Sequence, residues 1–193
     1  MLRAPRLRDA RAWSQVRLRN RDWLEQWEPS SATPWETRNS AAAWRSMYSA
    51  FRRAGKYGQA APFMIYYGGD LVGQITVSNI VHGALQSCTV GYWIDKAMSG
   101  RGIMPTALAM VIDHAFTAIG LHRVEVDIRP ENAASLRVVE KLGLRQEGYY
   151  ERFLDIGGKW CDHLAYAITL EELHGQTMLS RVPARPGRLH ETY

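Results

Sequence analysis

The sequence predicts an α+β fold, in which one mixed, mainly antiparallel sheet carries helices packed on its faces. Three observations predict it. Two helix-like segments come first, three strand-like segments follow in a row, and helices and strands then alternate. Because no repeat or linker divides the 193 residues, we expect one domain over residues 1–175. Residues 176–193 are expected to form a basic, poorly ordered tail.

The N-terminal region predicts amphipathic helices. Between Leu7 and Trp27, apolar residues are spaced among arginines as on one or two helices, and Pro29 stops the pattern. Trp23 and Trp27 are four residues apart, so they share a helical face. The spacing of apolar residues predicts another helix over Thr37–Phe51.

The later elements are predicted from alternation, helical spacing and turn residues. Gly68-Gly69-Asp70 indicates a hairpin turn, and a glycine closes each of the two later helices. The predicted strands are Phe63–Tyr67, Leu71–Val81, Leu85–Ile94, His122–Arg129, Arg152–Ile156 and Leu164–Leu170. The predicted helices are Thr106–Ile119 and Ala133–Leu142.

Composition and charge narrow the class of protein. Apolar residues make up 46% and charged residues 22%, as in soluble globular proteins, and no apolar run could span a bilayer. The charged N-terminus does not resemble a signal peptide, and two cysteines cannot form a disulfide framework. We therefore expect a reduced, cytoplasmic protein that does not engage a membrane.

The net charge of +5 raises the question of nucleic-acid binding. Much of the excess charge lies near the two ends of the chain, and the basic runs lack the interleaved aromatic residues of a single-strand binder. A solvated arginine-rich face explains this pattern, which argues against direct nucleic-acid binding.

A glycine loop between a strand and a helix is the first candidate site. The alternating stretch from Val90 ends at Asp95, Gly100 and Gly102 follow it, and Pro105 suits the first turn of a helix. Free N–H groups and the helix dipole make such a loop an anion site, for which a phosphate or pyrophosphate is the expected ligand. Taken alone, the motif is equally compatible with an ordinary tight turn.

Three spaced motifs carry a family resemblance. They are G-Y-W-I-D-x(5)-R-G-I-M-x-T-A-L at 91–108, R-V-E-x-D-I-x-P-E-N-A-A-S-x-x-V-x-E-K-L-G-L at 123–144 and G-K-W-x-D-H-x-x-Y-A at 158–167. In this order they resemble the GNAT N-acetyltransferases, in particular the RimJ/RimL branch. The resemblance implies a twisted sheet whose central strands splay apart at the site, and acetyl-CoA as the acetyl donor.

The resemblance also implies which residues hold the donor. The backbone around Trp93, Ile94 and Asp95 would pair with the pantetheine arm, and the loop would hold the pyrophosphate. The implied loop residues are Gly100, Arg101, Gly102, Ile103, Met104 and Thr106. Asn132 matches the asparagine beside the pantetheine, although an asparagine before a helix is also an ordinary N-cap.

Two departures from the family pattern affect the chemistry. Ala97 stands where a polar residue often begins the loop, and Val139 stands where many members carry a tyrosine acid. Ser135 resembles a serine placed near the sulfur in some members, so it is a candidate both for binding the donor and for assisting the leaving thiolate. It could equally be a first-turn serine that satisfies the backbone.

An amine acceptor must lose a proton before it attacks a thioester, so a base or a water relay is needed. Asp127 and Glu151 are the candidate bases, each weighed against an ordinary solvated carboxylate. Asp162 and His163 form a tempting pair that we interpret as structural. No spacing of histidines and cysteines indicates a metal site.

The resemblance favours the N-terminal α-amino group of a protein as the acceptor, with a ribosomal protein as the partner. The tryptophan-rich segment Trp23–Trp35 could instead be core, but together its residues could line a groove for a peptide, with Glu25, Glu28 and Glu36 attracting an ammonium. Two alternatives remain: an acetyltransferase for a small amine or antibiotic, and a non-enzymatic CoA-binding or RNA-associated module. The sequence leaves open whether the chain forms a homodimer.

Overall fold

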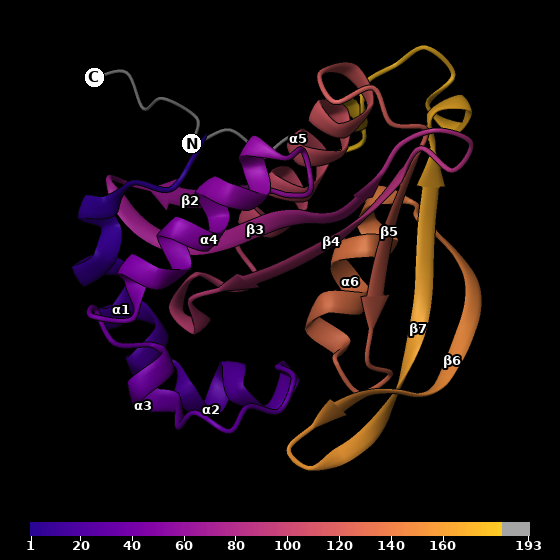
Figure 1. Cartoon of the computed structure of the whole chain (residues 1–193). Coiled ribbons are helices and arrows are strands. Elements are labelled where there is room, and N and C mark those ends of the chain that lie inside the picture. The colour runs from indigo at the N-terminus through magenta and orange to yellow at the C-terminus, as the bar shows by residue number, and fades with distance from the viewer. Residues whose placement is uncertain (183–193) are drawn as a thin grey trace, which may run out of the picture.

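The computed structural model describes residues 1–182 and consists of one seven-stranded sheet flanked by helices (Figure 1). The strand order is β1-β2-β3-β4-β5-β7-β6. The strands are β1 (Leu2–Arg3), β2 (Ala61–Tyr67), β3 (Asp70–Val81), β4 (Ser87–Ile94), β5 (Arg123–Ile128), β6 (Arg145–Ile156) and β7 (Lys159–Thr169). The helices are α1 (Ala10–Arg19), α2 (Arg21–Leu24), α3 (Trp35–Arg38), α4 (Trp44–Lys56), α5 (Ile103–Thr117) and α6 (Ala133–Leu142).

The sheet is antiparallel at every strand pair except β4 and β5, which run parallel. These two strands pair only from Ser87 and Arg123 to Thr89 and Glu125. Beyond that point they diverge, as Figure 1 shows. The predicted mixed sheet with splayed central strands is therefore confirmed.

Helices cover both faces of the sheet. Adjacent residues of a strand point to opposite faces, and Met64 and Ile65 of β2 pack into two different clusters. Met64 lies with Trp13 of α1 and Trp44 of α4, whereas Ile65 belongs to the larger core formed with α5 and α6. Among residues 1–182, no helix has both the length and the apolarity needed to cross a bilayer.

Several predicted element boundaries were wrong. The single helix predicted over Thr37–Phe51 is two helices, because the Ser40 hydroxyl accepts from the Ala43 N–H in a turn that separates α3 from α4. Helix α5 begins at Ile103, directly after a left-handed glycine. Strand β6 begins at Arg145 and not at Arg152, because two register shifts and a left-handed Arg152 interrupt its alternation. The short strand β1 was not predicted.

Residues 176–182, which the sequence analysis assigned to the tail, pack against the rest of the described chain. Met178 begins a short 3-10 helix, is fully buried and donates its N–H to the Asp113 carboxylate of α5 at 2.6 Å. Arg181 donates to the Leu142 carbonyl oxygen at 3.2 Å. This segment is therefore part of the core, and the rest of the predicted tail, 183–193, lies outside the described residues.

Candidate functional site

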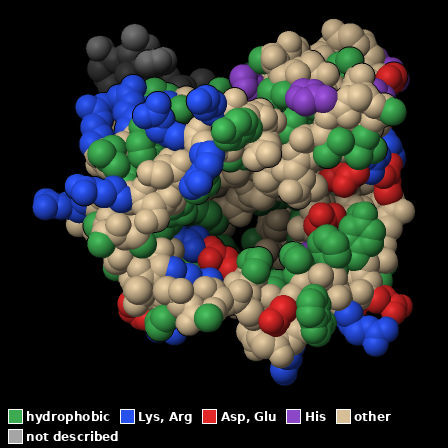
Figure 2. Space-filling view, in the orientation of Figure 1, with side chains coloured by type: hydrophobic (Ala, Val, Ile, Leu, Met, Phe, Trp, Pro, Cys, Tyr) green, Lys and Arg blue, Asp and Glu red, His purple; other side chains and the backbone are tan. Residues whose placement is uncertain are grey.

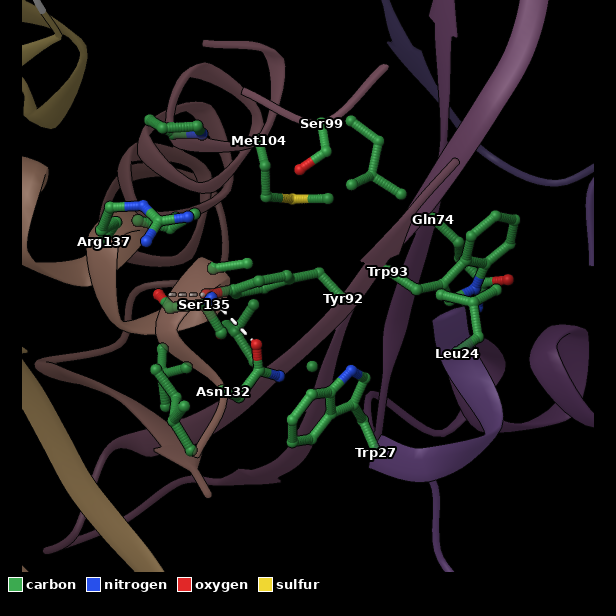
Figure 3. A pocket seen from close by; sticks show the side chains of 18 of the residues that line it. Leu24, Trp27, Gln74, Tyr92, Trp93, Ser99, Met104, Asn132, Ser135 and Arg137 are labelled. Carbon is green, nitrogen blue, oxygen red and sulfur yellow. Dashed lines mark hydrogen bonds between the residues drawn. The ribbon is translucent and has the colours of Figure 1, made fainter. Parts of the chain in front are cut away.

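A cavity of about 500 Å³ opens where β4 and β5 diverge. It is visible as a hollow in the face shown in Figure 2, and Figure 3 shows side chains that line it. Its walls come from β3, β4 and β5, from the starts of α5 and α6, and from the N-terminal segment around Trp27. The cavity therefore lies between two separated strands of the sheet, at the place where the motifs of residues 91–108 and 123–144 meet.

The glycine loop forms one end of this cavity. Gly100 and Gly102 have φ values of +76° and +73°, and a Cβ built on either would meet no atom within 4 Å. Gly102 is the N-cap of α5, so the N–H groups of Ile103 and Met104 belong to the first turn and have no acceptor within the helix. Open space, unpaired N–H groups and the positive end of a helix fit an anion such as a pyrophosphate.

Two of the predicted loop residues lie outside the cavity wall. Thr106 uses its hydroxyl to donate to the Gly102 carbonyl oxygen at 2.8 Å, which stabilises the first turn of α5. Arg101 lies between the two glycines, and its side chain does not line the cavity. The cradle therefore consists of backbone with Gly100, Gly102 and Met104 in its wall.

The backbone groups at the end of β4 point alternately toward β3 and toward the gap beside β5. The Asp95 N–H donates to the Val72 carbonyl oxygen of β3 at 2.8 Å, and the register pairs Trp93 with Gln74. Backbone groups of alternate residues point to opposite sides of a strand, so those of Tyr92 and Ile94 face the gap beside β5. Of the predicted trio Trp93, Ile94 and Asp95, only Ile94 directs its backbone there, although the Trp93 side chain lines the cavity.

The Asp95 side chain has a structural role that the sequence did not reveal. Its buried carboxylate is bonded by Arg19 and accepts from Asn20 Nδ2 at 3.0 Å and from the Ala97 N–H at 3.2 Å. Burial disfavours the charge, but the hydrogen bonds from Arg19 and Asn20 outweigh it and hold the pKa of Asp95 below its ordinary value. Asp95 thereby ties α1 to the end of β4.

The start of α6 places a pair of hydroxyls in the cavity. Asn132 is the N-cap, and its Oδ1 accepts from the Ser135 N–H at 3.1 Å (Figure 3). The Ser135 hydroxyl lies 2.8 Å from the Tyr92 hydroxyl of β4. Burial raises the pKa of Tyr92, a shift that the bond to Ser135 partly offsets. Tyr92 was not predicted as a site residue, since nothing in the sequence indicates which serine it would reach.

The predicted bases separate clearly in the structure. Asp127 lines the cavity, and its Oδ1 is buried with no hydrogen-bond partner among the described residues. Burial, assisted by the charge of Glu125, raises the pKa of Asp127 to about 6. Glu151 lies on β6 with 72% of its side chain exposed, beside Arg152 and outside the cavity. The structure therefore does not bring Glu151 to the cavity with Asp127, because the bulged edge strand turns it to solvent.

Asp162 and His163, the pair interpreted as structural, lie in different surroundings. Asp162 bonds Tyr149 and the Arg152 N–H on the exposed hairpin. His163 is 4% exposed, lines the cavity and donates from Nδ1 to the Cys161 carbonyl oxygen at 3.1 Å. Burial lowers the pKa of His163, so the neutral ring is favoured.

The N-terminal tryptophans divide between cavity and core. Trp23 and Trp27 line the cavity, and the Trp23 indole N–H donates to the gap-facing carbonyl oxygen of Ile94 at 3.1 Å. Trp35 is buried at 2% exposure. A second cavity, of about 450 Å³, shares Glu28 and Pro29 with the first and lies between the following loop and the β6–β7 turn.

The three glutamates near these tryptophans are already paired. Glu28 is bound by Arg17, and Arg38 lies 3.8 Å from its other oxygen. Glu25 and Glu36 both pair with Arg21. The three carboxylates that the sequence analysis offered to an ammonium are thus each held by arginines of the same segment. Asp127 instead presents an unpartnered carboxylate oxygen.

Comparison with known proteins agrees with this geometry. Residues 1–145 match the family model for the acetyltransferase (GNAT) domain. The chain is 35% identical over 151 residues to the probable N-acetyltransferase YjcK of Bacillus subtilis, covering 77% of this chain and 82% of that one. It is 29% identical over 164 residues to the ribosomal protein uS5-alanine N-acetyltransferase of Escherichia coli, covering 84% and 83%. The structure of Mycobacterium smegmatis RimJ in complex with CoA-disulfide superposes with a TM-score of 0.91 at 45% identity, covering 93% and 86%.

We predict that Asp127→Asn stabilises the folded chain at neutral pH. The Asp127 carboxyl has a pKa of about 6 in the folded chain, against 3.8 as its ordinary value. As pH rises through this window, the unfolded chain loses a proton that the folded chain keeps, so the free energy of unfolding falls. The asparagine variant lacks this fall and should be more stable at pH 7 by about 1 to 3 kcal/mol.

Urea denaturation across this pH range measures the effect. Asp70→Asn, at the exposed β2–β3 turn, is the matched control. If the Asp127 variant kept the pH dependence of the parent chain, the raised pKa of Asp127 would be contradicted.

Proposed function

We propose that this chain, which belongs to the GNAT family of acetyl-CoA-dependent N-acetyltransferases, acetylates the N-terminal α-amino group of a ribosomal protein. The observation that carries the proposal is the unpartnered Asp127 oxygen in a cavity that shares two wall residues, Glu28 and Pro29, with a second cavity beside it. A small amine needs one closed pocket, whereas a peptide terminus needs a path that extends beyond its first residue. Relatives named for acetylating ribosomal protein uS5 support the same acceptor class.

The residues of the splayed site fit acetyl-CoA. The N–H groups of Ile103 and Met104 would hold its pyrophosphate, and the gap-facing backbone of Tyr92 and Ile94 would pair with its pantetheine arm, in place of the missing part of β5. Asn132 lines the same wall while it caps α6. When bound, acetyl-CoA supplies the acetyl group as an activated thioester.

Asp127 is proposed as the base. An amine terminus arrives as an ammonium, which can donate to the unpartnered Oδ1 and give up a proton there. A carboxyl with a pKa of about 6 is ionised at neutral pH and is still basic enough to accept that proton. The base thus arises from burial and not from a partner residue.

Ser135 and Tyr92 are proposed to assist the leaving sulfur. Val139, at the position of the family tyrosine, is fully buried in the core and has no proton to donate. The Ser135 hydroxyl can donate a hydrogen bond to the sulfur as it gains negative charge, and Tyr92 in turn donates to Ser135. Because its pKa is raised, Tyr92 stays protonated and positions the serine proton.

We predict that Gly102→Val weakens CoA binding by at least about tenfold, since a branched side chain would occupy the cradle. Gly83→Val is the matched control: Gly83 has a φ of +75°, also has open space around a Cβ, and lies on the distant β3–β4 turn. Both variants incur a similar backbone penalty. Calorimetry with CoA separates them, and equal affinities in two folded variants would contradict the cradle.

We predict that Tyr92→Phe lowers kcat by about tenfold with acetyl-CoA, the effect of losing one buried hydrogen bond in the transition state. With an acetyl arylthioester, whose thiolate leaves without assistance, the loss should largely disappear. Tyr149→Phe is the control, because that tyrosine also donates to a side chain, Asp162, but lies outside the cavity. An equal loss with both donors would indicate a merely structural role for Tyr92.

The acceptor is tested by incubating the enzyme and acetyl-CoA with peptides that carry ribosomal-protein N-termini, with the same peptides blocked at the α-amine, and with free polyamines and aminoglycosides. We expect acetylation at the unblocked α-amine, located by mass spectrometry. Trp27→Ala should raise KM for the peptide and leave KM for acetyl-CoA unchanged, whereas Tyr57→Ala, at 66% exposure directly after α4 and outside both cavities, should change neither. Activity confined to small amines would favour the alternative acceptor class.

A further inference from the structure

Helix α4 carries a stripe of cations on its outer face. Arg45, Arg52 and Lys56 are separated by seven and four residues, which places them within about 40° of one another around an α-helix. All three are exposed, while Trp44, about 100° from Arg45 around the helix, is fully buried against α1. The stripe is therefore directed to solvent along about three turns of the helix.

The neighbouring N-terminal segment extends this charge. Helix α4 packs against α1 and against the 3-10 helix Leu7–Asp9. Arg8 and Arg11, in and next to that short helix, are also exposed. We call these two arginines and the α4 stripe the basic face. Figure 2 shows Lys and Arg side chains gathered over the part of the molecule where Figure 1 shows α4 and the N-terminal segment.

No acid balances the basic face. Residues 1–21 and 37–60 contain a single acidic residue, Asp9, which is 3% exposed and bonded to Arg3. In the described part of the chain, the ion pairs involve none of the five cations of the basic face. This differs from the segment around Glu28, where arginines and glutamates pair. Five unpaired cations on adjoining elements form a surface for a polyanion.

We propose that the basic face binds the phosphate backbone of double-helical RNA. The choice of RNA over DNA rests on the proposed ribosomal acceptor. A membrane does not fit, because an interfacial helix must insert its apolar face, and that face of α4 is packed in the core. Ser46, Ser49 and Ala50 are exposed between the cations, and Tyr57, at 66% exposure, follows Lys56. One exposed ring at the end of the stripe is not a row of aromatic residues on which successive bases stack, which favours a helical backbone over splayed single strands.

The sequence argued against nucleic-acid binding because its cations lie in separate stretches. In the folded chain, Arg8 and Arg11 adjoin a helix that begins more than thirty residues later. None of the five cations lines the acetyl-transfer cavity, so RNA and both substrates could be held at the same time.

The test compares Arg45→Gln/Arg52→Gln with Arg152→Gln/Lys159→Gln, which removes two exposed cations from the β6–β7 hairpin. Binding of a labelled RNA hairpin is measured by fluorescence anisotropy over a salt series. The α4 variant should bind at least about tenfold more weakly at low salt, and its slope of log K against log salt should be smaller by about 2, one unit for each lost phosphate contact. The hairpin variant should bind like the parent chain.

Peptide acetylation and vesicle binding show whether the α4 variant affects RNA binding alone. Acetylation of a short peptide should be unchanged in the α4 variant, which shows that its site is intact. RNA binding is read without acetyl transfer, so a failure of the proposed acceptor would not obscure it. Equal RNA affinity in the α4 variant and the parent, or binding to anionic lipid vesicles as tight as to RNA, would overturn the proposal.

Discussion

The short pairing between β4 and β5 is the constraint on which the rest of the site depends. Once the two strands separate beyond Thr89 and Glu125, backbone groups of β4 face a gap in place of a neighbour. Buried backbone N–H and C=O groups require partners. The fold satisfies one of them with the Trp23 indole, on the Ile94 carbonyl. An extended, amide-bearing ligand supplies the kind of partner that the others lack.

The open sheet is held in shape from the N-terminal side. Asp95 terminates β4 and binds Arg19 and Asn20, so the segment that carries Trp23 and Trp27 is attached to the strand that lines the cavity. At the other end of this segment, Ser30 bonds Asp155 of the β6–β7 hairpin at 2.9 Å. These two contacts place one continuous wall across the gap. The cavity is therefore defined by contacts between residues that are more than seventy positions apart.

Charge is distributed unevenly over the molecule, and the distribution separates structural from functional groups. Glu25, Glu28 and Glu36 are matched by arginines, and Asp95 is held by hydrogen bonds. Asp127 has no such partner and is accordingly shifted toward its neutral form. The basic face shows the opposite imbalance, with cations that no acid offsets. A charged group without a partner is costly to a protein or chemically reactive. The Asp127 carboxylate would be paired by an amine terminus, and the cations of the basic face by the phosphates of RNA.

The sequence by itself determined the parts of this protein that depend on local geometry. The glycines before α5, the N-cap role of Asn132 and the order of strands and helices all follow from residues within a few positions of one another. Only the tertiary structure decided what distant residues do. The Tyr92 hydroxyl meets Ser135 across 43 positions, Asp95 serves as a clamp, Glu151 is turned to solvent by a bulge, and scattered arginines are either paired with glutamates or gathered on one face. Spacing along a chain fixes direction within one element, whereas contact between elements depends on how they pack.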